Sequence, residues 1–253
     1  MITQNGCGIL MIRIMRAFVP FFLFGIMCIA GNIIFIFFLV TQIYRFSIVT
    51  YISRDIVMFA WKLFLVMIKY FKWINYPKIN IDIRDKGCLI IANHPSLLDV
   101  VFLIAHIRHC NCVVKKELKR NIFLYPAIKC SRYITNEFNE EFLNKCINVL
   151  QQKENLIIFP EGTRTVDRIN MHKGASYIAV YGAEKIIPFY ITIEPKCLGK
   201  YDKWYNLPEN INYNVIPLEE ICLSNFEKNV AASLRVRHLH SFIKSIYENY
   251  NKL

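Results

Sequence analysis

The chain has 253 residues, with 31 lysines and arginines against 19 aspartates and glutamates, giving a formal net charge of +12. Hydrophobic residues make up 55% of it, which excludes a disordered polyampholyte and an ordinary soluble domain. The apolar excess lies in the first 75 residues, so we expect a membrane anchor over residues 1–75 and a globular domain over residues 76–253. Nine cysteines without a regular spacing indicate reduced thiols and therefore a reducing compartment.

The first predicted element is a membrane segment over residues 17–40. It has 24 positions without a charge, and at about 1.5 Å rise per residue a helix of this length spans a hydrocarbon core of about 30 Å. Gly31 and Asn32 leave a second possibility, a shallow hairpin with arms at residues 17–30 and 33–44. A cleaved secretory signal is disfavoured because the apolar run continues well past any small-residue cleavage site.

Basic residues flank this segment on both sides. Arg13 and Arg16 precede it, and the larger group follows it: Arg45, Arg54, Lys62, Lys69 and Lys72. Positive charge stays on the cytoplasmic side, so we expect a cytoplasmic-membrane protein whose domain faces the cytosol, with membrane lipids rather than nucleic acid as partners. Residues 54–74 mix lysines with aromatic residues, which favours a helix lying in the membrane interface over a second transmembrane or core helix.

From residue 80 onward, short β-branched runs alternate with segments of helical spacing. The predicted strands are residues 80–84, 88–92, 111–115, 155–159, 186–193 and 211–216. The predicted helices are residues 97–107, 138–152, 172–182 and an amphipathic tail over 226–250, with apolar positions at Val230, Leu234, Phe242 and Ile246. Strands alternating with helices predict a layered α/β domain.

The first candidate site is the segment from Asn93 to Asp99, directly after the 88–92 strand. A histidine with a carboxylate nearby is the minimal general-base pair, because the carboxylate fixes the imidazole tautomer and stabilises the imidazolium. Pro95 disfavours helical geometry at His94 and suits the first turn of a helix, so Asp99 can lie one turn in and reach back. The alternative is structural: Ser96 and Asp99 also have the spacing of a helix capping box.

The second candidate site is Phe159-Pro160-Glu161-Gly162-Thr163-Arg164-Thr165, again after an apolar strand. Ligands of open α/β sheets lie beyond the carboxyl ends of strands, so the two segments are expected to share one cleft. Arg164 offers a guanidinium for a phosphate, and Gly162 permits close backbone approach to a ligand. A turn with solvated charges is the alternative interpretation.

Other chemistries find little support in the sequence. His106, His109, Cys110 and Cys112 fall within seven residues, but the Cys-x-Cys spacing is tighter than zinc sites use, so we expect no metal. The sequence has no Gly-x-Ser-x-Gly, no phosphate-binding loop and no dinucleotide glycine pattern, so we expect neither a serine nucleophile nor a cofactor.

Taken together, Asn-His-x-x-x-x-Asp at 93–99 and Phe-Pro-Glu-Gly-Thr-Arg at 159–164 resemble the glycerolipid acyltransferase family, which includes the lysophosphatidic acid acyltransferases. The resemblance covers about residues 85–192 and includes Lys115-Lys116-Glu117-Leu118 and Ile187-Pro188-Phe189. It implies a layered mixed sheet flanked by helices.

The resemblance also implies roles for individual residues. His94 is expected to be the general base and Asp99 its orienting partner, with direct attack of an acceptor hydroxyl on an acyl thioester. Glu161, Gly162, Thr163 and Arg164 are expected to position the acceptor. Lys115 and Lys116 are expected to meet an anionic acceptor head or an acyl carrier protein; a solvated basic face is the alternative.

The expected donor is acyl carrier protein or a coenzyme A thioester, and the expected acceptor is a lysolipid, foremost lysophosphatidic acid. One departure from the family pattern bears on the acceptor, because Asn136 stands where a phosphate-binding arginine is expected. Lys129, Arg132 or Arg164 are candidates to replace that arginine. The alternatives are an acceptor without a phosphate, such as an aryl-polyene lipid, or a non-catalytic lipid-binding module.

Overall fold

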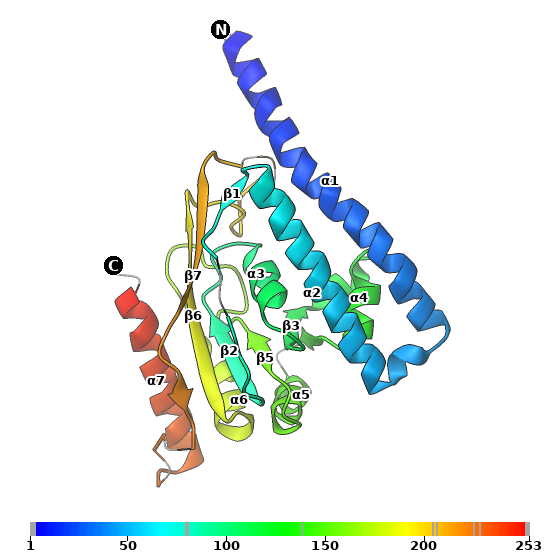
Figure 1. Cartoon of the computed structure of the whole chain (residues 1–253). Helices are drawn as coiled ribbons and strands as arrows, with labels where there is room; N and C mark the ends of the chain where they lie inside the picture. Colours follow the sequence, from blue (N-terminus) through cyan, green and yellow to red (C-terminus); the bar gives the residue numbers. More distant parts are fainter. Residues whose placement is uncertain are drawn as a thin grey trace.

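The computed structural model describes residues 4–78, 81–137, 139–203, 205, 207–224, 226–227 and 229–250, leaving out the side chains of residues 4–13, 16 and 17. The described residues form one eight-stranded sheet with helices on both faces (Figure 1). Its strands are β1 (Ile74–Asn75), β2 (Cys88–Ala92), β3 (Asn111–Lys115), β4 (Ile134–Asn136), β5 (Leu156–Ile158), β6 (Lys185–Glu194), β7 (Ile211–Pro217) and β8 (Ile221–Cys222).

The sheet is mixed, as the sequence predicts. Its strand order is β1-β7-β6-β2-β5-β3-β4, with β8 paired to β6 beside this path. β2 lies at the centre, parallel to both β5 and β6, whereas β7 and β8 run antiparallel to β6. Every residue of β2 is buried, which is why this strand is a continuous apolar run in the sequence.

Helices cover both faces of the sheet. They are α1 (Gln4–Val40), α2 (Ser47–Tyr70), α3 (Asp99–His106), α4 (Tyr125–Cys130), α5 (Glu140–Gln151), α6 (Gly174–Gly182) and α7 (Ala232–Tyr250), with short 3-10 turns at Ile43–Arg45 and Lys116–Arg120. Cys88, Ile90 and Ala92 of β2 pack in the core shared with α2 and α3, and the alternate residues Leu89 and Ile91 pack toward α5, α6 and α7. The alternation of side chains along the strand thus builds two separate cores.

Several short elements differ from the sequence prediction. Residues 81–84 are irregular, so the strand predicted at 80–84 is wrong there; Asn80 lies outside the described residues. β1, β4, β8 and α4 were not predicted, because two to six residues are too few to establish a period. The other five predicted strands are present to within two residues at each end.

α1 is one continuous helix through Gly31 and Asn32, so the shallow hairpin with a turn at these residues is wrong. The chain turns instead at residues 41–46, and α2 then runs back beside α1 (Figure 1). Asn32 fits within the helix because its amide donates to the Ile122 carbonyl at 3.5 Å. By length and composition, one helix among the described residues could cross a membrane, with its apolar stretch at Phe18–Val40.

α2 begins earlier than the predicted segment at 54–74 and has two different faces. One face is buried against the sheet-covering helices, including Arg54, Leu65 and Ile68. The opposite face exposes large apolar side chains such as Phe59 and Val66. The helix therefore serves as a core helix on one face and leaves an apolar surface on the other.

The C-terminal helix α7 begins at Ala232, six residues later than predicted. The residues buried on the sheet are Val236, Leu239, Ile243 and Tyr247. Leu234 and Phe242, which the sequence analysis assigned to the apolar stripe, are exposed. The amphipathic tail is present, but its buried face was misassigned because two apolar stripes run along one helix.

Candidate active site

The site begins where β2 ends, at Asn93. The Asn93 side chain is buried and pairs with the backbone of Ile191 on β6 in both directions, donating at 2.8 Å and accepting at 2.7 Å. The backbone pairing of β2 with β6 ends at Ala92, and the Asn93 side chain continues it by one more residue. It fixes the direction in which the chain leaves the sheet, and therefore where His94 lies.

His94 and Asp99 form a buried pair. The His94 Nδ1 to Asp99 Oδ2 distance is 2.7 Å, and the Asp99 side chain is fully buried. Because a carboxylate only accepts hydrogen bonds, Nδ1 carries the proton and Nε2 is left with its lone pair. The His94 ring stacks on Phe159 at a centroid distance of 4.3 Å, which holds the imidazole plane. The pair predicted from the sequence spacing thus has hydrogen-bonding geometry.

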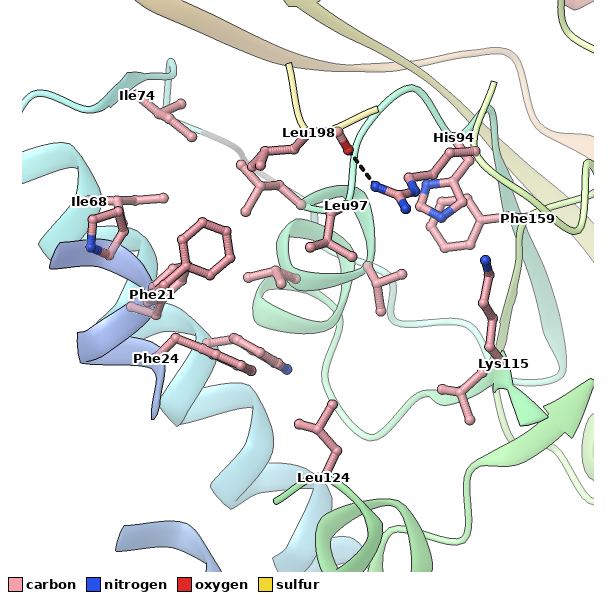
Figure 2. A pocket seen from close by; sticks show the side chains of 18 of the residues that line it. Phe21, Phe24, Ile68, Ile74, His94, Leu97, Lys115, Leu124, Phe159 and Leu198 are labelled. Carbon is pink, nitrogen blue, oxygen red and sulfur yellow. Dashed lines mark hydrogen bonds between the residues drawn. The ribbon is translucent and has the colours of Figure 1, made fainter. Parts of the chain in front are cut away.

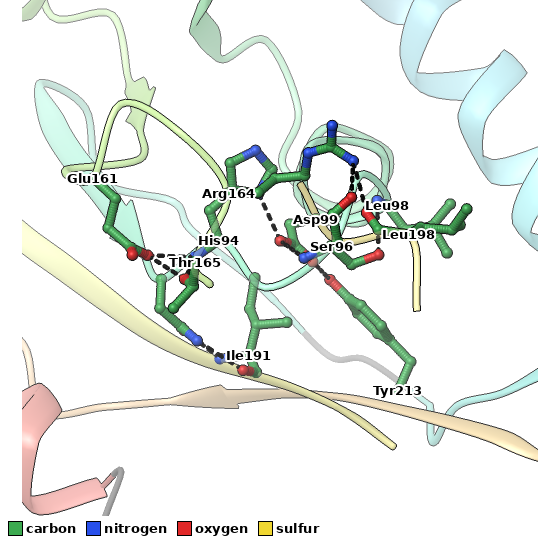
Figure 3. Close-up of polar contacts among 12 residues, drawn as sticks. His94, Ser96, Leu98, Asp99, Glu161, Arg164, Thr165, Ile191, Leu198 and Tyr213 are labelled. Carbon is green, nitrogen blue, oxygen red and sulfur yellow. Dashed lines mark hydrogen bonds and ion pairs between the residues drawn. The ribbon is translucent and has the colours of Figure 1, made fainter. Parts of the chain in front are cut away.

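Asp99 also caps the helix that it begins. The backbone N–H of Ser96 donates to the same Oδ2 at 2.8 Å, which is one half of a capping box. The other oxygen, Oδ1, accepts from the hydroxyl of Tyr213 at 2.7 Å (Figure 3). Burial raises the pKa of Asp99, and its hydrogen bonds with His94, Ser96 and Tyr213 counteract that rise. The capping and catalytic interpretations are therefore compatible, because one carboxylate makes both hydrogen bonds.

Glu161 holds the second motif against the first. Its Oε1 accepts from the His94 backbone N–H at 2.9 Å and from the Thr165 hydroxyl at 2.6 Å. The Thr165 N–H in turn donates to the His94 carbonyl at 2.7 Å. Burial raises the pKa of Glu161, and these donors offset part of the rise. Glu161 does not line the cavity described below, so its contacts are with the loop that bears the base.

Arg164 and Gly162 reach the cavity from the same loop. The Arg164 guanidinium donates to the carbonyls of Leu198 and Gly199 at 2.8 and 2.6 Å, so the segment after β6 holds it in place. Gly162 has φ of +63°, a left-handed conformation that glycine adopts without strain. Thr163 lies between them, half-exposed, and does not line the cavity.

A cavity of about 470 Å³ extends from His94 between the helices and the sheet (Figure 2). Polar and charged side chains line only the His94 end: His94 itself, Lys115, Asn136 and Arg164. The rest of the wall is apolar and comes mainly from α1, α2, α3 and the strand ends, including Phe21, Phe24, Trp61, Phe64, Ile68 and Val101. A volume of this size lies within the range of about 300–1,000 Å³ that small-molecule sites occupy.

Lys115 and Lys116, adjacent in sequence, have different surroundings. Lys115 lines the cavity and points toward Phe159 and His94 in Figure 2, and it is the β3 neighbour of Asn136 on β4. Lys116 lies 4.0 Å from the Glu137 carboxylate and does not line the cavity. Of the two lysines predicted from the sequence, only Lys115 thus lines the cavity.

Asn136 stands where the family pattern has an arginine, and two of the side chains considered as replacements have partners outside the cavity. Lys129 lies over the ring of Tyr44, and Arg132 donates to the backbone of Arg45. Lys115 is the strand neighbour of Asn136, and Arg164 lines the same cavity. Among the described residues, the buried Oδ1 of Asn136 has no hydrogen-bond donor. The positive charge at the site comes from the ends of β3 and β5, not from β4.

Among the described residues, no three His, Cys, Asp or Glu side chains gather as metal ligands. Cys110 and Cys112 are free thiols in the core, and burial raises the pKa of Cys110 to about 12. His109, from the same cluster in the sequence, pairs with Asp55 at 2.9 Å. His106 contacts the Phe102 carbonyl, so these two cysteines and two histidines have different partners.

Sequence reasoning missed Tyr213, Phe159 as a ring partner and the apolar wall from α1 and α2. Phe159 stands in the motif itself, so its role could have been noted. Tyr213 lies 114 positions from Asp99, and no local pattern connects the two. The wall could not be foreseen, because the two helices were expected to contact lipid.

Residues 75–192 match the family model described as Acyltransferase. These residues, a little under half of the chain, contain both motifs and the His94–Asp99 pair, and they are similar to the acyltransferase family. The structure resembles the crystal structure of the 1-acyl-sn-glycerophosphate acyltransferase PlsC from Thermotoga maritima, with a TM-score of 0.60 and 20% sequence identity. That similarity covers 88% of this chain and 95% of the other, and it establishes the shared fold.

Several curated relatives are similar to part of the chain. The 1-acyl-sn-glycerol-3-phosphate acyltransferases of Saccharomyces cerevisiae and Helicobacter pylori are each 32% identical, over 123 and 131 residues, or 44% and 48% of this chain. The human beta enzyme is 30% identical over 145 residues, 49% of this chain. The matched parts make up 40%, 53% and 49% of these three relatives, so the chain spans about half their length or less.

Proposed function

We propose that this protein transfers an acyl chain from a thioester to the hydroxyl of a lysophospholipid, with lysophosphatidic acid as the acceptor and phosphatidic acid as the product. The observation that carries the proposal is the opening of the His94–Asp99 pair into an apolar cavity of about 470 Å³. A general base beside a space suited to a hydrocarbon chain is what acyl transfer to a lipid hydroxyl requires.

The chemistry needs one base and correct positioning. His94 Nε2 takes the proton from the acceptor hydroxyl as its oxygen attacks the thioester carbonyl, forming the new C–O bond. The tetrahedral intermediate then collapses with cleavage of the C–S bond, and the imidazolium returns its proton to the leaving thiolate. Asp99 stabilises the imidazolium between these steps. A thioester is already activated, so no acyl-enzyme and no metal are needed.

The apolar part of the cavity is the proposed site for a fatty acyl chain. Its wall combines α1, α2 and α3, and the ring of Phe24 stacks on Trp61 at 5.5 Å and meets Phe64 edge-on at 6.2 Å. Burial of a chain here removes apolar surface from water at about 25 cal/mol per Å². The acyl chain is thereby held with its carbonyl end near His94.

Lys115 and Arg164 are the proposed ligands of the acceptor phosphate. Both line the polar end of the cavity with His94, and a charge-assisted contact from each offsets the two negative charges of a phosphate monoester. Asn136 supports a second acceptor class, a lysolipid without a terminal phosphate, because its neutral carboxamide can hydrogen-bond to a hydroxyl but lacks the positive charge that an arginine would offer to a phosphate.

The donor is proposed to be acyl carrier protein or acyl-coenzyme A at a cytosolic membrane face. α1 and α2 are the proposed membrane contact. α1 packs on α2 and α4, with Pro20 and Phe35 buried, while apolar residues such as Phe22, Ile29 and Ile33 are exposed. A helix covered by protein on one side is suited to lying along a membrane surface, with the lysines of α2 near anionic headgroups.

Purified protein in phospholipid vesicles tests the function. Labelled acyl carrier protein and acyl-coenzyme A are offered separately, each with lysophosphatidic acid or with lysolipids lacking a terminal phosphate, and His94→Ala serves as the blank. We expect transfer to lysophosphatidic acid that is absent from the blank. Transfer only to acceptors without a phosphate would replace the acceptor and keep the mechanism. No transfer to any acceptor, with either donor, would contradict the proposal.

A further inference from the structure

Tyr213 connects β7, which lies two strands from β2 in the sheet, to the proposed catalytic pair. It lies on β7, where it pairs with Ile193 of β6, beyond the matched acyltransferase segment at residues 75–192. Its ring is fully buried and stacks on Phe102 of α3 at a centroid distance of 3.8 Å. Its hydroxyl donates to Asp99 Oδ1 at 2.7 Å, as Figure 3 shows.

We propose that Tyr213 is a positioning residue for acyl transfer, holding the Asp99 carboxylate so that Oδ2 faces His94 and tempering the charge that His94 meets. This inference rests on the proposed function. Tyr213 does not line the cavity, so it acts on the substrate only through Asp99 and His94.

The arrangement around Asp99 explains why a third group is useful. Oδ2 is shared by the Ser96 N–H and His94 Nδ1, so rotation of the carboxylate about its Cβ–Cγ bond would break both contacts. The Tyr213 hydroxyl on Oδ1 opposes that rotation, because it is fixed by a buried ring packed on the helix that carries Asp99. Two anchored donors on opposite oxygens define one orientation of the carboxylate plane.

The hydroxyl also remains a donor at working pH. Burial and the nearby Asp99 charge raise the pKa of Tyr213 well above its ordinary value of 10, so the phenol stays protonated. A protonated phenol draws negative charge toward Oδ1, and the Oδ2 that faces His94 is a weaker partner than an isolated carboxylate.

Tyr213→Phe removes the hydroxyl and keeps the ring on Phe102. We expect kcat to fall about tenfold, the loss typical of a hydrogen bond to a charged group, with the KM for the acceptor unchanged. We also expect the acid limb of the kcat/KM profile to move to higher pH, because the unshared carboxylate stabilises the imidazolium more strongly.

Tyr247→Phe is the matched control. Tyr247 is equally buried, but its hydroxyl donates to the Ile91 and Phe189 carbonyls at 3.2 and 2.9 Å and does not touch the pair. It should lower thermal stability about as much as Tyr213→Phe and leave the pH profile of kcat/KM in place. Equal shifts of the profile in both variants, or no shift in either, would overturn the positioning role.

Two further measurements separate this inference from the proposed function. In the His94→Ala background, Tyr213→Phe should change the residual rate by less than about twofold, because Tyr213 acts through His94. Proton NMR of the His94 Nδ1–H needs no substrate, and its resonance should move in Tyr213→Phe but not in Tyr247→Phe. If the resonance moves in Tyr213→Phe but the wild type transfers no acyl chain, the positioning contact stands and the proposed function is refuted. If the wild type is active but Tyr213→Phe changes neither the resonance nor the kinetics, only the role of Tyr213 is refuted.

Discussion

The two ends of the cavity are built in different ways. At the polar end, His94 lines the cavity and is held by Asp99, Glu161 and Thr165, which lie outside the lining; hydrogen bonds of 2.6 to 2.9 Å join these four residues near two strand ends. At the apolar end, Phe21, Phe24 and Ile68 come from two N-terminal helices and make only packing contacts with the cavity. Polar geometry is specified by a few short contacts, whereas the shape of the apolar end depends on how whole helices pack.

This difference separates rate from selectivity. Loss of the base at the polar end is expected to lower the rate by orders of magnitude, and changes at the apolar end are expected to alter which acyl chain is accepted. The experiments below test that division.

The largest expected effect is that of His94→Ala, which removes the base. We expect kcat to fall about 10³-fold with either donor, within the range that general-base catalysis contributes. His106→Ala is the matched control, because His106 lies at the end of α3 with Nδ1 2.8 Å from the Phe102 carbonyl, outside the cavity. Steady-state rates of both variants are measured in the same vesicles. Transfer by His94→Ala at close to the wild-type rate would contradict the assignment of His94 as the base.

Lys115→Ala tests the charge at the polar end. The KM for lysophosphatidic acid should rise about tenfold, since a charge-assisted contact with the phosphate is lost. Lys116→Ala removes the same charge one residue away, from a lysine that faces Glu137, and should leave this KM within twofold. If both variants behave alike, bulk surface charge and not a phosphate contact governs acceptor binding.

Ile68→Phe tests the apolar end, which Ile68 lines at a distance from His94 in Figure 2. The larger side chain should lower kcat/KM for long acyl chains about fivefold relative to short ones, because it fills space that the chain end needs. Leu63→Phe adds bulk to the exposed face of the same helix and should not change the ratio. A competition assay with acyl thioesters of mixed length measures both. An unchanged ratio for Ile68→Phe would place the acyl chain elsewhere.

Glu161→Gln has the smallest expected effect, and it appears in stability. Burial raises the pKa of Glu161 above its ordinary value of 4.5, so the folded state binds this proton more tightly than the unfolded state. Its contribution to stability is full below about pH 4.5 and is lost as the pH rises through the raised pKa.

As the pH rises from 4 to 8, the thermal midpoint of the wild type should therefore fall relative to that of Glu161→Gln. Circular dichroism in detergent at several pH values measures this difference. Asp99 is present in both proteins, so its own titration cancels. A difference that stays constant with pH would show that Glu161 does not titrate in this range.

Much of the α/β domain could be predicted from local patterns. The continuous apolar runs of β2, β3 and β6 are strong signals of buried strands, and the amphipathic period of α5 is a strong signal of a helix. The 80–84 strand was wrong because an alternating run also needs a neighbouring strand to pair with. The buried face of α7 was misassigned because the sequence does not say which of its two apolar stripes meets the sheet.

The sequence by itself determined the chemistry of the two motifs, because His94 and Asp99 lie five residues apart and Pro95 fixes how the chain turns between them. It also determined that the first 75 residues are apolar and flanked by positive charge. Only the tertiary structure decided that Lys115 and not Lys116 meets the cavity, that α1 and α2 form its wall, and that Tyr213 reaches Asp99. These contacts join residues tens to more than a hundred positions apart, and their distances depend on the order of strands and the packing of helices, which no local period encodes.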